Sequence, residues 1–200
     1  MKQIILTTIL AFTTISLNAQ TLYGYYTNHA SKAKTKYKIE YVLNGLDEKP
    51  CVLIEVIGEA DKNYLMVDID SLSSIQKGFR ELKAKYIEWC DVAIKNNVTE
   101  VEKEMKYPFH GGIGASWYNS DWWFSRGFSW NLKPTFKIKG ASKIVSFAQA
   151  VRSDSNEFVT NNVYLIFTSV QDFDSLINML NSNKISAKIK NAKSMEDLFK

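Results

Sequence analysis

The chain has 200 residues, of which 46% are hydrophobic and 13% aromatic, and its formal net charge at pH 7 is +4. This composition is typical of a globular protein and excludes an intrinsically disordered one, which would contain fewer apolar residues. The positive charge comes from scattered lysines, since the chain contains only three arginines: Arg80, Arg126 and Arg152. Because phosphate and base recognition depend strongly on arginine, we expect no nucleic-acid partner.

The first twenty residues, MKQIILTTILAFTTISLNAQ, have the pattern of a secretory signal peptide. Lys2 precedes an apolar run from Ile4 to Leu17, and the small residue Ala19 stands at the expected cleavage site. We therefore predict a signal peptide over residues 1–19 and an exported protein, either periplasmic or secreted. A buried N-terminal helix is the alternative. No later apolar run is long enough to cross a membrane, so we expect no membrane span after cleavage.

The end of this segment, NAQ, resembles the export signals of Bacteroidetes, in which glutamine often begins the mature chain. The small size and the richness in lysine, asparagine and isoleucine also resemble the small exported proteins of these bacteria. The resemblance implies export and carries no site. We expect no cofactor.

Strands are predicted in the first half of the chain. In KYKIEYVL, residues 36–43, apolar and charged side chains alternate, as in a strand with one buried face. CVLIEVIG, residues 51–58, and YLMVDI, residues 64–69, are more continuously apolar. Continuous apolar runs are typical of central strands that are buried on both faces.

A long amphipathic helix is predicted after these strands. From Leu72 to about Ile94, apolar residues recur at steps of three and four positions, as in a helix with one buried face. The side-chain oxygens of Asp70 or Ser71 are expected to cap its first turn. We expect this helix to pack on its own sheet rather than to form a coiled coil.

The second half of the chain repeats the order of strands followed by a helix. Strands are predicted near residues 112–118, 122–132, 134–139, 143–151 and 158–168. A shorter helix follows, with an apolar face formed by Phe173, Leu176, Ile177 and Leu180. A last short helix is expected to begin at Ser194.

These elements predict a single α+β domain over residues 20–200. It consists of a large curved antiparallel sheet, or two sheets, packed by one long and one shorter helix. The sequence DIDSL at 68–72 begins the long helix, and DFDSL at 172–176 begins the shorter one. This similarity indicates two related units, about 20–97 and 98–200.

Two patterns concern covalent chemistry. DSL resembles the O-glycosylation site of exported Bacteroidetes proteins at Ser71 and Ser175, and plain helix capping is the alternative. Cys51 and Cys90 both occur in apolar elements. Export permits a disulfide between them, and two buried thiols are the alternative. The two cysteines and two histidines lack the spacing of zinc ligands, so we expect no metal.

The segment GASWYNSDWWFSRGFSW, residues 114–130, contains four of the five tryptophans. Laid out as a strand, it places large side chains together on one face: Trp122, Phe124, Arg126, Phe128 and Trp130. Trp123 falls on the other face, among small and polar residues. Because each buried aromatic side chain removes roughly 150–250 Å² from water, we expect most of this cluster to be core.

Arg126 and Trp123 do not fit this division. Arg126 needs a carboxylate or an aromatic partner if it is buried among aromatic rings. Alternatively, Arg126 and Gly127 form a tight turn between two strands. The third interpretation is functional: Trp117, Trp123 and Arg126 bind an anionic or sugar-like ligand in a concave sheet.

Three functions are compatible with these patterns. The leading hypothesis is a non-enzymatic exported protein that binds a partner or ligand on an aromatic-rich sheet face, with Trp117 or Trp123 exposed. The second is a small hydrolase with His110 as base and Ser116 as nucleophile. PFHGGIGASW resembles the His-Gly-Gly loop of some esterases, but their Gly-x-Ser-x-Gly motif is absent from the sequence. The third is a structural or assembly factor with an exposed apolar patch and no small ligand.

Overall fold

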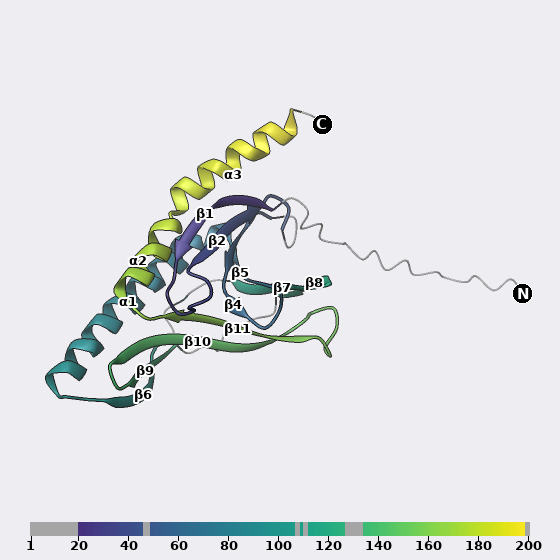
Figure 1. The fold of residues 1–200 in the computed structure, drawn as a ribbon. Helices are drawn as coiled ribbons and strands as arrows, with labels where there is room; N and C mark the ends of the chain where they lie inside the picture. The colour runs from purple at the N-terminus through teal and green to yellow at the C-terminus, as the bar shows by residue number, and fades with distance from the viewer. Residues whose placement is uncertain (1–19, 46–48, 107–108, 110–111, 127–133, 199–200) are drawn as a thin grey trace, which may run out of the picture.

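The protein folds into two antiparallel sheets flanked by helices (Figure 1). A computed structural model describes residues 20–45, 49–106, 109, 112–126 and 134–198. In this part of the chain, a six-stranded sheet has the order β1-β2-β3-β5-β7-β8, and a five-stranded sheet has the order β4-β11-β10-β9-β6. The predicted α+β class with antiparallel sheets is confirmed.

The elements have the following bounds. The six-stranded sheet consists of β1 (Thr21–Thr27), β2 (Lys36–Val42), β3 (Cys51–Glu55), β5 (Lys62–Asp68), β7 (Ile113–Asn119) and β8 (Asp121–Ser125). The five-stranded sheet consists of β4 (Ile57–Gly58), β6 (Glu100–Glu104), β9 (Thr135–Lys139), β10 (Ser142–Arg152) and β11 (Thr160–Phe167). The helices are η3 (Ile69–Ser71), a single 3₁₀ turn, and α1 (Leu72–Lys95), α2 (Val170–Met179) and α3 (Ser182–Asp197).

The six-stranded sheet buries side chains on both faces. Its inner face contributes to the main core through Tyr37, Ile39, Tyr41, Val52, Ile54, Leu65, Val67, Ile113, Ala115 and Trp117. Its outer face carries a second, smaller cluster of Val42, Cys51, Leu53, Tyr64 and Met66. β3 and β5 are continuously apolar for the predicted reason, which is that both of their faces are buried. Alternate residues of each strand enter different clusters.

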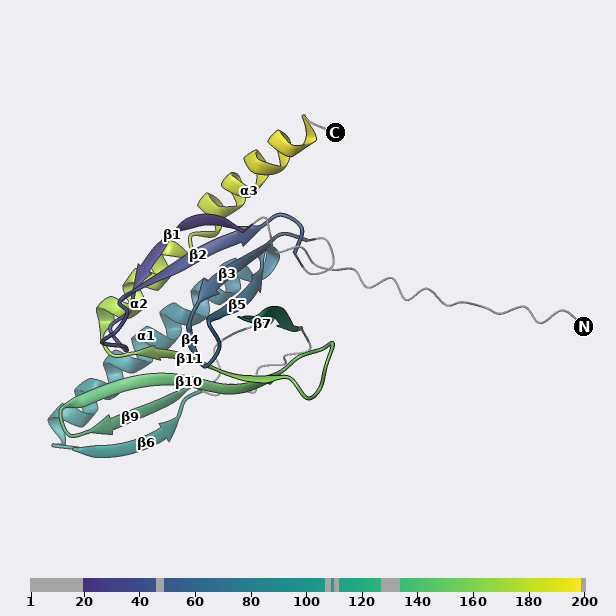
Figure 2. The ribbon, with the colours of Figure 1, turned by 45° about the vertical axis from the view of Figure 1, so that its right-hand side comes forward.

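Helix α1 begins at the predicted residue and contacts β5 of the six-stranded sheet as well as the five-stranded sheet. Its Phe79 ring lies 5.9 Å from Phe167 of β11, and the Tyr86 hydroxyl donates to the Lys143 carbonyl at 3.1 Å. Figures 1 and 2 show α1 running along one side of both sheets, whereas α3 extends away from them to the C-terminus. The main core thus lies between α1, α2 and the two sheets.

The predicted cap of α1 is not formed. Ser71 is the N-cap residue, but its side chain makes no capping hydrogen bond, and Asp70 lies within η3. The reason is geometric: η3 leads directly into α1, so the backbone of Ser71 is already helical, with φ −87° and ψ −14°. Side-chain capping requires an extended N-cap residue.

Two predicted boundaries in the second half need correction. The strand predicted over 122–132 ends at Ser125, and residues 127–133 lie outside the described residues. The last helix begins at Ser182 rather than at Ser194. Asn181 accepts a hydrogen bond from the Lys184 amide there and starts the helix twelve residues earlier.

Two strands were absent from the prediction, β1 and β6. β1 has an irregular register between Leu22 and Gly24, which breaks the alternation of its side chains. β6, with the sequence EVEKE, is an edge strand whose side chains are mostly exposed. Neither strand therefore produces the period-two apolar pattern by which a buried strand is recognised.

Strands from both halves of the chain occur in each sheet. β7 and β8 join the six-stranded sheet, and β4 joins the five-stranded one. The two related units, about 20–97 and 98–200, stay a prediction. Cys51 in β3 and Cys90 in α1 do not form a disulfide with each other.

Candidate functional site

The β7–β8 hairpin positions three of the tryptophans, and Trp130 lies outside the described residues. Trp117 and Trp123 are cross-strand partners in this hairpin. Trp117 is only 1% exposed in the main core, and Trp123 packs against the same core. The predicted placement of Trp123 on a polar face is therefore wrong, because it points to the same side of the sheet as its buried partner.

Trp122 and Phe124 lie on the outer face, where they cover the smaller cluster. The Trp122 ring centre is 6.1 Å from Tyr64 and 5.4 Å from Tyr118. The ammonium group of Lys62 lies 5.5 Å from the Tyr118 ring centre and 5.9 Å from that of Trp122. These partly exposed rings and the lysine form an aromatic, cationic surface at the edge of the sheet.

Two buried oxygen atoms on this face have no hydrogen-bond partner among the described residues: Oε2 of Glu40 and Oγ of Ser116. Glu40 is 7% exposed and Ser116 is fully buried. Tyr64 connects them, because it pairs with Ser116 across β5 and β7 and hydrogen-bonds with Glu40. Burial and this hydrogen bond raise the pKa of the Tyr64 hydroxyl. Buried polar atoms normally have partners, so these two oxygens require an explanation.

Arg126 is exposed and follows the last residue of β8. Its amide donates to Asp154 Oδ2 at 2.6 Å, and the Asp154 amide donates to the Phe124 carbonyl at 2.8 Å. These two bonds fix the end of β8 to the loop between β10 and β11. Arg126 is therefore not buried among aromatic rings, which was one of the three interpretations of its sequence position.

Arg126 lines a cavity of about 150 Å³ together with Cys51, Met66, Asp68, Gly112, Ile113 and Gly114. The close packing around Gly112 and Gly114 leaves no room for a side chain at either position. A Cβ atom on Gly114 would lie 2.8 Å from the Ser125 carbonyl oxygen, and one on Gly112 would lie 2.8 Å from Asp68 Oδ2. The cavity thus combines a guanidinium, a carboxylate, two glycines and the side chains of Cys51, Met66 and Ile113.

A second polar cluster, which the sequence analysis missed, joins His29 to Asp172. Asp172 is fully buried and accepts from the ring Nδ1 of His29 at 2.7 Å and from the His29 amide at 3.1 Å. Its other oxygen accepts from the amide and hydroxyl of Thr168 at 2.9 and 2.7 Å. Nearby, Ser175 Oγ accepts from the Thr27 amide at 2.7 Å. These bonds attach the end of β1 to α2.

Asp172 should make the stability of the protein depend on pH. Burial acts to raise the pKa of its carboxyl group, but the hydrogen bonds from His29 and Thr168 outweigh burial and lower it. The pKa of the Asp172 carboxyl group is therefore lower in the folded protein than in the unfolded chain, where it is about 3.9. The stabilisation is present above the unfolded-state pKa and is lost as the pH falls through the folded-state pKa.

Urea unfolding of the wild type and of Asp172→Asn from pH 7 to pH 2.5 measures this effect. The difference between their free energies of unfolding should be constant above about pH 5 and should shrink below about pH 4. A difference that stays the same over the whole range would contradict the assignment.

The hydrolase alternative has only one of its two residues in the described structure. His110 lies outside the described residues, and Ser116 is buried between Tyr64 and Phe124, its cross-strand neighbours. Within the described ranges, no group of three or more histidine, cysteine or acidic side chains is arranged to hold a metal ion. No helix in the same ranges is both long and apolar enough to cross a membrane.

Comparison with known proteins does not identify a relative. The chain matches no protein-family model, and no curated protein or solved structure is significantly similar to it.

Proposed function

We propose that this protein is exported and binds a ligand on the outer face of the six-stranded sheet, without catalysing a reaction on it. Export rests on the signal-like pattern of residues 1–19. Binding rests on one observation: the partly exposed rings of Trp122 and Phe124 cover the smaller cluster of the outer face, and the buried Ser116 Oγ beside Phe124 has no hydrogen-bond partner among the described residues. Small-molecule sites commonly combine an apolar surface with a few such polar groups.

The chemistry of this face favours a ligand with a flat apolar side and a polar edge, such as a glycan or a small aromatic acid. Trp122 and Phe124 offer ring surface for stacking. Arg126 and Asp68, at the adjacent cavity, can donate to and accept from hydroxyl or carboxylate groups. Trp117 and Trp123 support the face from beneath, since both pack against the main core.

A fluorescence titration of the protein with a panel of glycans and small organic acids tests this proposal. We expect at least one ligand to bind saturably. Trp122→Phe or Arg126→Gln should weaken the affinity for that ligand by about tenfold, which is typical of central residues of a binding site. Acrylamide quenching should reach Trp122 and should leave the buried Trp117 largely protected.

Two matched variants serve as controls. Arg152→Gln removes an exposed arginine of the five-stranded sheet, and Trp89→Phe changes a partly buried tryptophan of α1. Both should leave the affinity unchanged. The proposal fails if no ligand of the panel binds, or if the controls weaken binding as much as the changes on the outer face.

A further inference from the structure

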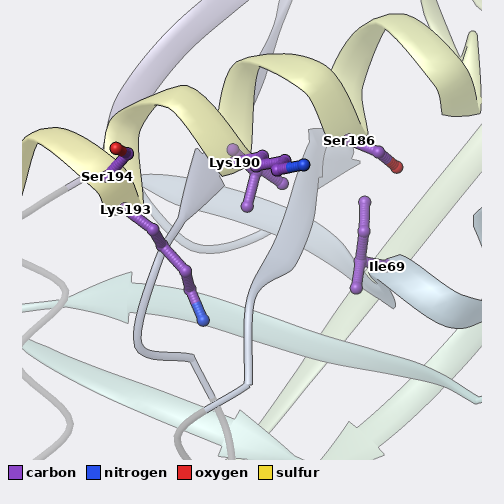
Figure 3. A pocket seen from close by; sticks show the side chains of 6 residues that line it. Ile69, Ser186, Lys190, Lys193 and Ser194 are labelled. Atoms are coloured by element: carbon purple, nitrogen blue, oxygen red, sulfur yellow. The ribbon is translucent and has the colours of Figure 1, made fainter.

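A groove separate from the outer-face site runs along α3. Its volume is about 450 Å³, and it is lined by Ile69, Ser186, Ile189, Lys190, Lys193 and Ser194. Figure 3 shows Ile69 of η3 beneath the helix, with Lys193 extending down from α3 beside the groove. This volume is within the range of small-molecule pockets, about 300–1,000 Å³.

The two flanks of α3 have different surroundings. Ile185 and Ile189 are buried against the body and fix the orientation of the helix. Ser186, Lys190 and Lys193 follow at steps of four and three positions, so they share the flank that borders the groove. Lys184 and Lys188 share the opposite flank, where the ammonium group of Lys188 lies 5.2 Å from the Tyr23 ring centre.

The residues of the groove have complementary chemistry. The partly exposed Ile69 and the accessible edge of the buried Ile189 provide an apolar floor. Lys190 and Lys193 provide two ammonium groups, and Ser186 and Ser194 provide hydroxyls. None of the six lining residues is acidic. A ligand that fits this set has an anionic head and an apolar body, because the lysines attract the charge and the isoleucines remove hydrocarbon from water.

We propose that this groove binds a long-chain carboxylate, with its head at Lys190 and Lys193 and its hydrocarbon chain on Ile69 and Ile189. A single amphiphile fits better than a bilayer surface. Helices that lie on membranes insert their apolar face into the lipid, whereas the apolar face of α3 is already packed on the protein. The site is independent of the outer face of the six-stranded sheet.

Isothermal titration with decanoate tests this inference, with 1-decanol and acetate as partial ligands. Decanoate should bind with 1:1 stoichiometry and at least about tenfold more tightly than either partial ligand, because only decanoate uses both the lysines and the floor. The double variant Lys190→Gln/Lys193→Gln should weaken decanoate binding by about tenfold. Ile69→Ser should also weaken it, and circular dichroism should show that these variants stay folded.

The matched control is Lys184→Gln/Lys188→Gln, which removes the same charge from the opposite flank of the same helix. It should leave decanoate binding unchanged. Equal weakening by both double variants would overturn the proposal, because it would indicate general attraction to a cationic protein. Absence of decanoate binding, equal binding of 1-decanol, or binding only to anionic phospholipid vesicles would also overturn it.

Discussion

Replacing Asp172 by alanine should lower the free energy of unfolding by about 3–5 kcal/mol, one of the two largest losses that we expect from a single change. The carboxylate is fully buried and accepts four hydrogen bonds, two from His29 and two from Thr168. Its removal leaves a cavity and deprives all four donors of their acceptor. Because the bonds join β1 to α2 across 143 residues of sequence, we expect both elements to loosen together.

The measurement is urea unfolding followed by circular dichroism at pH 7. Asp174→Ala is the matched control, because Asp174 lies on the same helix but is partly exposed and pairs with Lys83 at the surface. A surface pair of this kind contributes about 0–1 kcal/mol. Losses of equal size for the two variants would show that the bonds of Asp172 do not stabilise the fold.

The role of Asp172 could not be predicted from the sequence. In DFDSL, the first aspartate is placed near a helix start and is adequately explained by helix capping. Ser169 in fact caps α2, and Asp172 bonds to a histidine from a loop near the other end of the chain. Nothing local marks a partner 143 residues away, because tertiary contacts leave no periodic signal.

Local patterns predicted the fold class, since they report which residues are apolar and at what period. The stripe from Leu72 predicts α1, and the alternation of residues 36–43 predicts β2. The face of each strand was harder to predict. Trp122 and Trp123 are adjacent in β8, so their side chains point to opposite faces of the sheet. Both pack against apolar clusters, because the six-stranded sheet buries side chains on both faces. The alternation of side chains along a strand separates its two faces but does not identify which face meets the main core.

The candidate site was predicted only in outline. The sequence directed attention to the aromatic segment and to Arg126, which does border a cavity. It did not indicate Glu40, because a glutamate that alternates with apolar residues is normally a solvent-facing one. Glu40 is 7% exposed on the outer face, where it interacts with the Tyr64 hydroxyl of β5. Which side chain lies over Glu40 depends on the order of the strands in the sheet, and the sequence did not specify that order.

Trp117→Ala should be comparably destabilising, with a loss of about 3–5 kcal/mol in the free energy of unfolding. Trp117 is 1% exposed and is among the largest fully buried side chains of the described core. Its neighbour Trp123 packs on the same side, so truncation would leave a cavity that few side chains can fill. Urea unfolding checks this value, and a loss below about 1 kcal/mol would contradict the buried placement.

Trp122→Ala in the adjacent strand distinguishes packing from binding in the aromatic segment. Trp122 is partly exposed and covers only the smaller cluster, so its truncation should cost about 1–2 kcal/mol and leave the protein folded. If the outer face is the binding site, this variant should lose ligand affinity while retaining most of its stability. A ligand that still binds normally to Trp122→Ala would place recognition elsewhere and leave the aromatic segment a purely structural role. The two tryptophans thus allow packing and binding to be tested separately, because Trp117 is buried in the main core and Trp122 is partly exposed on the outer face.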